Sequence, residues 1–371
     1  MRRCFAVLIA FLSLAACAKQ DDAQPPAPEP VSAQAQVSDE LPGLASPATG
    51  IAFWEHPSLA FNSTMLVASE SGLAAYNMED GAMVGAVDGF KARGLALSYF
   101  GRGAQAAGFA AVLDEDRKAF RFYGIDNQSR TLLPLNGDIE MTDPVRGFCL
   151  GRGGDSITPT LYAILDGKVR LYNLAPAADG VSVTSDHTLL VPENTVSCAV
   201  NDYPTLVIAA EDGSIYRVTS DDDPYSKPFA KAATGKAGDL QFVMWTEEET
   251  GARKGLLLLA DRDSGAVSVI DAESGALVGS VAFAETSDVE GVDAAPVFAA
   301  ASVNFGALYR TGAIAFAAEA ADGPSIRLAP LDALLNALSI KGGDPVSPRG
   351  KTPDDKQAGI TIKTDIAAQP Q

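Results

Sequence analysis

Positive charge is scarce in this sequence. The chain has 28 lysine and arginine residues against 47 aspartate and glutamate residues, a formal net charge of −19. This imbalance argues against binding to nucleic acid and against electrostatic docking on anionic lipid, since both are negatively charged. Long apolar runs are scarce too, because the only one covers residues 5–14. A convincing helix signal is confined to residues 331–338. The body of the protein is therefore expected to consist of β-strands.

The N-terminus has the pattern of a secretion signal. Arg2 and Arg3 precede the apolar run, which is about ten residues long and too short for the ~20 that a membrane-spanning helix needs. Leu14-Ala15-Ala16-Cys17 resembles the lipobox of bacterial lipoproteins. That resemblance implies a signal peptide over residues 1–17 and acylation of Cys17. The alternative is an ordinary secretory signal with an incidental cysteine.

Lipidation implies a protein of the cell envelope. Several acyl chains on Cys17 would hold it stably on a membrane. Ala18 as the next residue resembles sorting to an outer membrane, with the protein facing the periplasm or the exterior. Residues 18–46 are rich in proline and alanine and are predicted to be a disordered tether. Residues 339–371 are predicted to be a mobile tail.

Cysteine is rare, with four residues in the chain. Cys4 would leave with the signal and Cys17 would carry lipid. Cys149 and Cys198 remain, in an oxidising compartment where a disulfide can persist. Because the sequence does not give the Cα separation that a disulfide requires, two buried thiols are the alternative.

A β-hairpin pattern recurs along the chain. In the third copy, Leu161-Tyr162-Ala163-Ile164-Leu165 precedes the turn Asp166-Gly167 and the alternating segment Lys168-Val169-Arg170-Leu171-Tyr172. The copies start about 44 to 57 residues apart, which fits four strands per unit. A β-sandwich would need closer spacing, and a parallel β-helix would need shorter repeats. We therefore predict a six-bladed β-propeller of four-stranded antiparallel blades over residues 47–338.

Several segments, in order, resemble the β-propeller phytases. They are Ala52-Phe53-Trp54-Glu55-His56-Pro57, Ser71-Gly72-Leu73, Gly147-Phe148-Cys149-Leu150, Val196-Ser197-Cys198-Ala199-Val200-Asn201, Ile208-Ala209-Ala210-Glu211-Asp212-Gly213 and Asp288-Val289-Glu290-Gly291-Val292-Asp293. The resemblance implies a 3-phytase-like hydrolase that uses calcium to bind and hydrolyse myo-inositol hexakisphosphate. Ca²⁺ would be held by carboxylate oxygens and would activate water. The family needs no histidine nucleophile, and this chain has only two histidines.

The sequence departs from that family where the chemistry resides. Positions that carry acids, lysines, an arginine and a tyrosine in the family align here with other residues: Thr49, Gly50, Ser69, Glu70, Ala96, Ser98, Arg146, Val196 and Gln241. Without the carboxylates, calcium loses ligands, and without the cations, phosphate loses fixed partners. We therefore expect weak or lost catalysis.

Some acids remain at family positions. A residual calcium site is predicted from six of them: Glu211, Asp212, Asp239, Asp288, Glu290 and Asp293. The alternative is that they only solvate turns. Arg146 is a candidate anion ligand if it faces the channel, and otherwise a solvated or ion-paired side chain.

Two functions stay open from the sequence. The first is a phytase-like phosphohydrolase, and the second is a non-catalytic binding or scaffolding propeller of the envelope. Fold alone does not choose between them. The expected ligand is an inositol phosphate or another small anion, the expected partner is the membrane through the lipid, and a monomer with no nucleic-acid partner is predicted.

Overall fold

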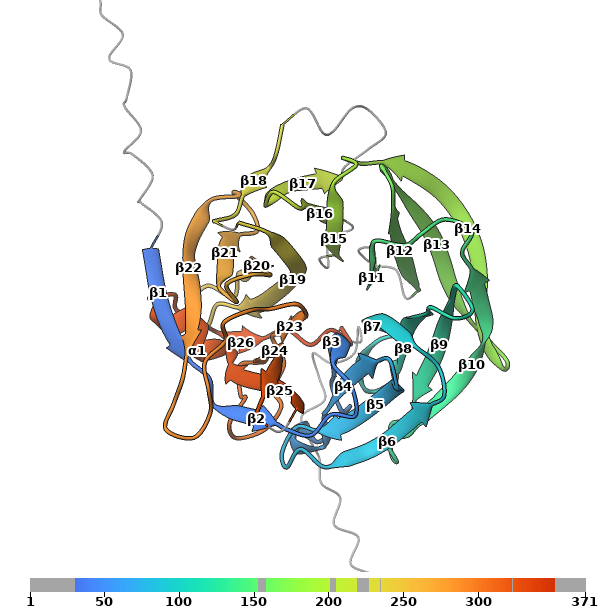
Figure 1. Ribbon diagram of the computed structural model, residues 1–371, viewed down its shortest axis with the longest axis horizontal. Coiled ribbons are helices and arrows are strands. Elements are labelled where there is room, and N and C mark those ends of the chain that lie inside the picture. Colours follow the sequence, from blue (N-terminus) through green and yellow to red (C-terminus); the bar gives the residue numbers. More distant parts are fainter. Residues whose placement is uncertain are drawn as a thin grey trace, which may run out of the picture.

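The computed structural model describes residues 31–152, 158–200, 205–218, 227–233, 235–321 and 323–350. Within them the strands form five sheets arranged as a ring (Figure 1). The predicted all-β, propeller-like architecture is confirmed. Residues 1–17, with the lipidation candidate Cys17, lie outside the described residues. None of the described helices has the length and apolar character needed to cross a bilayer.

The ring begins with two sheets. A four-stranded sheet of order β3-β4-β5-β6 contains β3 (Ala48–Trp54), β4 (Thr64–Ser69), β5 (Gly72–Asn77) and β6 (Met83–Asp88). An eight-stranded sheet of order β11-β12-β13-β14-β10-β9-β8-β7 contains β7 (Ala92–Phe100), β8 (Ala107–Asp114), β9 (Ala119–Ile125), β10 (Leu132–Glu140), β11 (Gly147–Arg152), β12 (Pro159–Leu165), β13 (Lys168–Ala177) and β14 (Gly180–Leu190). Its two antiparallel halves meet at one parallel pair, Asn136 with Gly180.

Three further sheets complete the ring. A four-stranded sheet contains β15 (Thr195–Val200), β16 (Leu206–Ala210), β17 (Ser214–Val218) and β18 (Ala230–Lys231). A six-stranded sheet of order β1-β22-β21-β20-β19-β26 contains β1 (Val31–Gln36), β19 (Ala237–Thr246), β20 (Arg253–Asp261), β21 (Val267–Asp271), β22 (Leu277–Ala284) and β26 (Asp344–Pro345). The last sheet, of order β2-β25-β24-β23, contains β2 (Asp39–Leu41), β23 (Phe298–Ala301), β24 (Ala313–Ala320) and β25 (Gly323–Pro330).

Helical structure is brief among the described residues. The predicted helix is present as α1 (Leu331–Ala337), which buries Leu331, Leu334 and Leu335 beside the last two sheets. Two 3₁₀ turns, η1 (Ala60–Asn62) and η2 (Gly103–Gln105), lie in loops that follow β3 and β7.

Local sequence explains the hairpins. In the turn between β21 and β22, Asp271 accepts hydrogen bonds through Oδ1 from the backbone N–H groups of Glu273 and Ser274. Gly275 then adopts a φ of +76°, a conformation that side chains disfavour, and returns its N–H to the Asp271 carbonyl. Acid-initiated, glycine-terminated turns of this kind reverse the chain between antiparallel strands.

The core lies between neighbouring sheets. For example, Trp54 and Leu66 of the first sheet form one buried cluster with Tyr99, Val112 and Tyr123 of the second. Each large apolar side chain buried in this way stabilises the fold by about 1.5–3 kcal/mol. Because every sheet packs on the next one, the faces of the sheets are occupied, and the axis of the ring is lined by the inner strands.

The predicted tether over residues 18–46 is wrong in its C-terminal part. β1 pairs in parallel with β22, and β2 pairs with β25, so these two segments extend the outer edges of the last two sheets. A free edge of a sheet offers unpaired N–H and C=O groups, and an extended segment of almost any composition can satisfy them. The propeller therefore begins before residue 47 and is closed by joining the two ends of the fold.

The predicted mobile tail over residues 339–371 is also wrong in its first part. β26 pairs with β19, and Arg349 is only 2% exposed. The folded body thus extends to residue 350, and the rest of the predicted tail lies outside the described residues.

Candidate functional site

A central channel runs along the axis of the ring. The inner strands β3, β7, β11, β15, β19 and β23 each contact the next, and β23 contacts β3. Their N-terminal ends line a cavity of about 180 Å³, and their C-terminal ends line one of about 260 Å³. The two cavities share wall residues, among them Ile51, Leu95 and Gln241, so they adjoin in one channel.

Three arginines from separate parts of the ring line the cavity at the N-terminal ends of the inner strands. They are Arg93, Arg146 and Arg262, and we call this end of the channel the arginine mouth. Their presence is notable on a chain whose net charge is −19. Guanidinium groups are suited to carboxylate and phosphate, because they offer several N–H donors in one plane.

Arg93 and Arg146 of the mouth each have an acidic neighbour. Arg146 donates to Asp166 at 2.7 Å, and these side chains are 43% and 77% exposed. Arg93 lies 3.7 Å from Glu115. Ion pairs this exposed are worth about 0–1 kcal/mol, so an incoming anion can compete with them. For Arg146 both alternatives therefore hold: its side chain is paired with Asp166, and it also lines the channel.

Polar side chains of the same mouth tie neighbouring inner strands together. Thr49 of β3 donates its hydroxyl to the carbonyl of Ala92 in β7 at 2.7 Å. Ser197 of β15 donates to the carbonyl of Gly238 in β19 at 2.8 Å. Thr49 and Ser197 therefore hold neighbouring inner strands together.

Asp239 and Gln241 form the most complete tie. The N–H of Phe298 in β23 donates to Asp239 Oδ2 at 2.9 Å, and Gln241 Nε2 donates to the Phe298 carbonyl at 3.3 Å. The two side chains thus hold both backbone groups of one residue on the next sheet. Burial raises the pKa of Asp239, opposed by the Phe298 N–H and by the charge of Arg262. Of the six acids predicted to bind calcium, Asp239 is the one that lines the channel.

Replacing Asp239 by alanine should lower the free energy of unfolding by about 1–3 kcal/mol, because the Phe298 N–H would lose its acceptor. Asp239→Asn should cost much less, because the amide oxygen can still accept and burial disfavours the charged form. Urea denaturation of both variants measures the difference. Equal losses in the two variants would contradict an acceptor role for this side chain.

Cys149 and Cys198 form a disulfide in the channel wall. Their Cα atoms are 5.8 Å apart, and the bond joins β11 to β15, inner strands of different sheets. Both residues are buried. Of the two alternatives that the sequence left open, the structure has the bridged one.

The acids of the turn before β17 have local partners. Asp212 is bound by Lys231, whose Nζ lies 2.9 Å from its Oδ2, and by the Ser214 N–H. These contacts lower the pKa of the Asp212 carboxyl, the Lys231 hydrogen bond contributing most. Glu211 is exposed, and its backbone N–H and C=O bond to Asn194 and Ala237.

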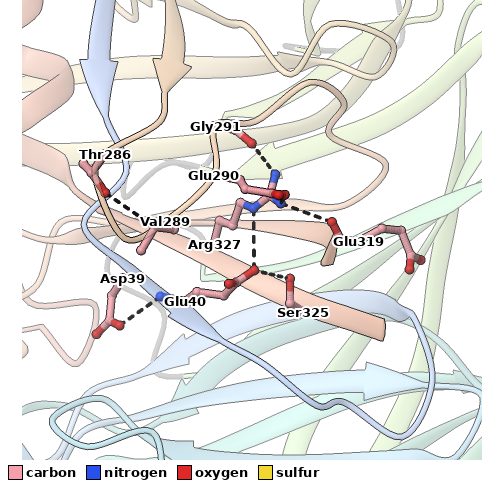
Figure 2. Close-up of polar contacts among 9 residues, drawn as sticks. All are labelled: Asp39, Glu40, Thr286, Val289, Glu290, Gly291, Glu319, Ser325 and Arg327. Atoms are coloured by element: carbon pink, nitrogen blue, oxygen red, sulfur yellow. Dashed lines mark hydrogen bonds and ion pairs between the residues drawn. The ribbon is translucent and has the colours of Figure 1, made fainter. Parts of the chain in front are cut away.

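The loop between β22 and β23 carries the other three acids, all exposed. Glu290 pairs with Arg327 of β25 at 2.6 Å (Figure 2). Asp288 accepts a hydrogen bond from the neighbouring Ser287 hydroxyl. Asp293 lies beyond Val292, which is buried in the core.

The structure does not bring the six acids together. Among the residues it describes, no three His, Cys, Asp or Glu side chains gather closely enough to hold a metal ion. Asp212 and Glu290 instead neutralise cations, and Asp239 ties two strands. Calcium binding stays a prediction from the resemblance.

Sequence reasoning missed two of the three mouth arginines. Arg93 lies near the start of β7, and Arg262 follows directly after β20. The sequence did offer one clue, which is the position of a residue within its repeat. The propeller repeat puts the start of each inner strand at the same end of the ring. Arg93 could have been found that way, whereas Arg262 follows a second strand and reaches the mouth through its loop.

Comparisons with known proteins identify no family for this chain. No family model matches the chain, and no curated protein matches it. Among solved structures, it is similar to Kluyveromyces lactis Hsv2, with 10% identity, coverage of 73% of this chain and 71% of that chain, and a TM-score of 0.37. A form of the same protein with loop 6CD replaced by a Gly-Ser linker gives 9% identity, 73% and 74% coverage, and a TM-score of 0.37. Similarity at this level carries no argument about function.

Proposed function

We propose that this protein is a non-catalytic binding propeller that takes a small, multiply charged anion at the arginine mouth. The observation that carries the proposal is the meeting of Arg93, Arg146 and Arg262 around one cavity. Fixed cations at the rim of a cleft concentrate anions there, and they do so against the repulsion of an otherwise acidic chain. An inositol phosphate or a similar polyanion would engage several guanidinium groups at once.

The chemistry of the mouth favours binding over hydrolysis. Phosphate hydrolysis of the kind implied by the phytase resemblance needs a cation that polarises phosphate and activates water. The side chains aligned with that family's ligands here form ties between strands, as Asp239 and Gln241 do with Phe298. We therefore propose that this propeller keeps the binding site of a phytase-like ancestor without its metal ligands.

Titration of the purified protein with myo-inositol hexakisphosphate, without added metal, tests the proposal. We expect saturable binding by calorimetry, and Arg146→Ala should weaken it about ten- to hundredfold, because a charge-assisted hydrogen bond is worth roughly 1.5–3 kcal/mol. Arg310→Ala is the matched control, since Arg310 is exposed and does not line the channel. Release of phosphate that requires Ca²⁺ would overturn the non-catalytic proposal, and unchanged binding by Arg146→Ala would overturn the site.

We also propose that the ring has six blades. Among the described residues, only one parallel residue pair, Asn136 with Gly180, joins the halves of the eight-stranded sheet in strand register, so each half counts as a blade. The strands β1 and β26 then count as additions to the β19–β22 blade. Six buried hydrophobic clusters, each between neighbouring four-stranded sets of the described residues, support this count.

Attachment to the cell envelope through Cys17 completes the proposal. It rests on the lipobox resemblance, and Cys17 lies outside the described residues. A propeller tethered in this way would hold its binding site close to a membrane. The negative charge of the protein would keep the propeller itself from adsorbing to that membrane.

A further inference from the structure

The channel's second end is covered by a segment of the chain itself. Residues 344–350, which we call the C-terminal strap, begin as β26 on the edge of β19. Val346 continues that pairing through its N–H to the Met244 carbonyl, and Val346 and Pro348 line the channel's larger cavity. The strap therefore lies across the C-terminal ends of the inner strands, opposite the arginine mouth.

Arg349 of the strap is held in a pocket made for a guanidinium group. Its Nε and Nη2 donate to the carbonyl of Glu55 at 2.9 and 2.6 Å, and its Nη1 donates to the carbonyl of Ala106 at 2.6 Å. Its Cζ lies 5.3 Å from the ring centre of Trp54 and 4.8 Å from that of Tyr99. Carbonyl acceptors in the plane and aromatic rings near it are what an arginine side chain prefers.

The pocket is built by residues far away in the sequence. Trp54 ends β3 and is fully buried, and it fits because Gly108 has no side chain: a Cβ there would lie 2.3 Å from the indole nitrogen. The Tyr99 hydroxyl accepts the N–H of Glu55, which orients the Glu55 backbone. The cradle is thus made by propeller residues outside the strap.

Neighbouring strap residues are also bound. The Ser347 hydroxyl donates to the Glu55 carboxylate, and Arg152 of β11 donates to the Pro348 carbonyl. The N–H of Gly103 donates to the Arg349 carbonyl at 3.0 Å. The strap is held by strand pairing at one end and by side-chain contacts at the other, and both are ways in which proteins bind extended peptides.

We propose that this end of the propeller is a binding site for an extended, arginine-bearing peptide, and that the C-terminal strap is its resident ligand and closes the channel there. The site recognises a short sequence with arginine two residues after serine, as in Ser347-Pro348-Arg349. A covalently attached ligand has an effective concentration in the millimolar range, so the strap excludes outside peptides while its arginine is intact. The inference does not rest on anion binding at the other mouth.

The test uses the full chain with Arg349→Ala and a synthetic peptide, Asp-Pro-Val-Ser-Pro-Arg-Gly, matching residues 344–350. The chain has two tryptophans, and both report on the strap: Trp54 faces Arg349, and Trp245 pairs with Pro345. We expect the peptide to change tryptophan fluorescence saturably in Arg349→Ala and to leave the unaltered protein unchanged. A peptide with lysine in place of arginine should bind about tenfold more weakly, because an ammonium cannot reproduce the planar contacts.

Arg310→Ala is the matched control and should behave as the unaltered protein does. Should Arg349→Ala fail to fold by circular dichroism, Arg349→Lys keeps the charge, and the arginine peptide should displace its weakened strap. Equal binding of the arginine and lysine peptides, or no binding at millimolar peptide by a folded variant, would overturn the proposal. Added to Arg349→Ala, the Arg146→Ala substitution should leave the peptide response unchanged, which separates this site from the arginine mouth.

Discussion

Loss of the Cys149–Cys198 disulfide is expected to lower the free energy of unfolding by about 4 kcal/mol. The bond closes a loop with a sequence separation of 49 residues, and the chain-entropy relation for a loop of this size gives about 4 kcal/mol at 25 °C. The bond joins inner strands of two sheets, β11 and β15, at the channel wall. Its removal therefore loosens the seam between these sheets as well as enlarging the unfolded ensemble.

Chemical denaturation of the double variant Cys149→Ala/Cys198→Ala measures this loss. The unaltered protein in strong reductant should unfold at nearly the denaturant concentration of the double variant, and the double variant should not respond to reductant. The alanine pair removes little volume, so a cavity adds little to the cost. If the unaltered protein unfolds at the same denaturant concentration with and without reductant, the disulfide does not stabilise the fold.

The fold was largely predictable because its repeats are local. The turn Asp166-Gly167 joins β12 to β13 as expected, and residues 331–338 give α1. β1 and β2 were not predictable, since the alanine, serine and glutamine residues of β1 and the two acids of β2 carry no strand signal. These segments become strands because the edges of β22 and β25 are available to pair with them.

The sites were less predictable, because their parts come from distant segments. The sequence of the strap predicts a loop. Its fixed position depends on contacts such as that between Arg349 and Ala106, which lie 243 residues apart. The disulfide had a usable signal: its cysteines lie one repeat length apart, in the same strand of consecutive units. Acidic residues gave a misleading signal, since the sequence cannot show that Glu290 faces an arginine or that Asp239 faces a backbone N–H.

The closure of the ring depends on Arg327, which is only 5% exposed. Its Nη2 pairs with Glu290 at 2.6 Å and donates to the Glu319 carbonyl at 3.1 Å, and its Nη1 donates to the Gly291 carbonyl (Figure 2). Its Nε lies 3.7 Å from Glu40 of β2, whose carboxylate also accepts the Ser325 hydroxyl. One guanidinium thus joins β2, β24 and β25 of the last sheet to the loop between β22 and β23.

Arg327→Met is expected to destabilise the protein by about 3–5 kcal/mol, because the buried Arg327 guanidinium makes several charge-assisted hydrogen bonds worth about 1.5–3 kcal/mol each and pairs with Glu40, whose side chain is only 22% exposed. Two carbonyls would lose their donor, and Glu40 would keep its charge without a cation. Because β2 is only three residues long, hydrogen exchange of its amides should accelerate more than exchange elsewhere.

The matched control is Lys341→Met, which breaks an ion pair with Glu249 whose side chains are 64% and 73% exposed. Its loss should stay below about 1 kcal/mol, because water solvates both charges there. Arg327→Lys should fall between the two, since an ammonium keeps the charge but cannot reach both carboxylates and both carbonyls. A loss below about 1 kcal/mol for Arg327→Met would contradict this role. It would mean that the few backbone hydrogen bonds between β2 and β25 are enough to hold the ring closed.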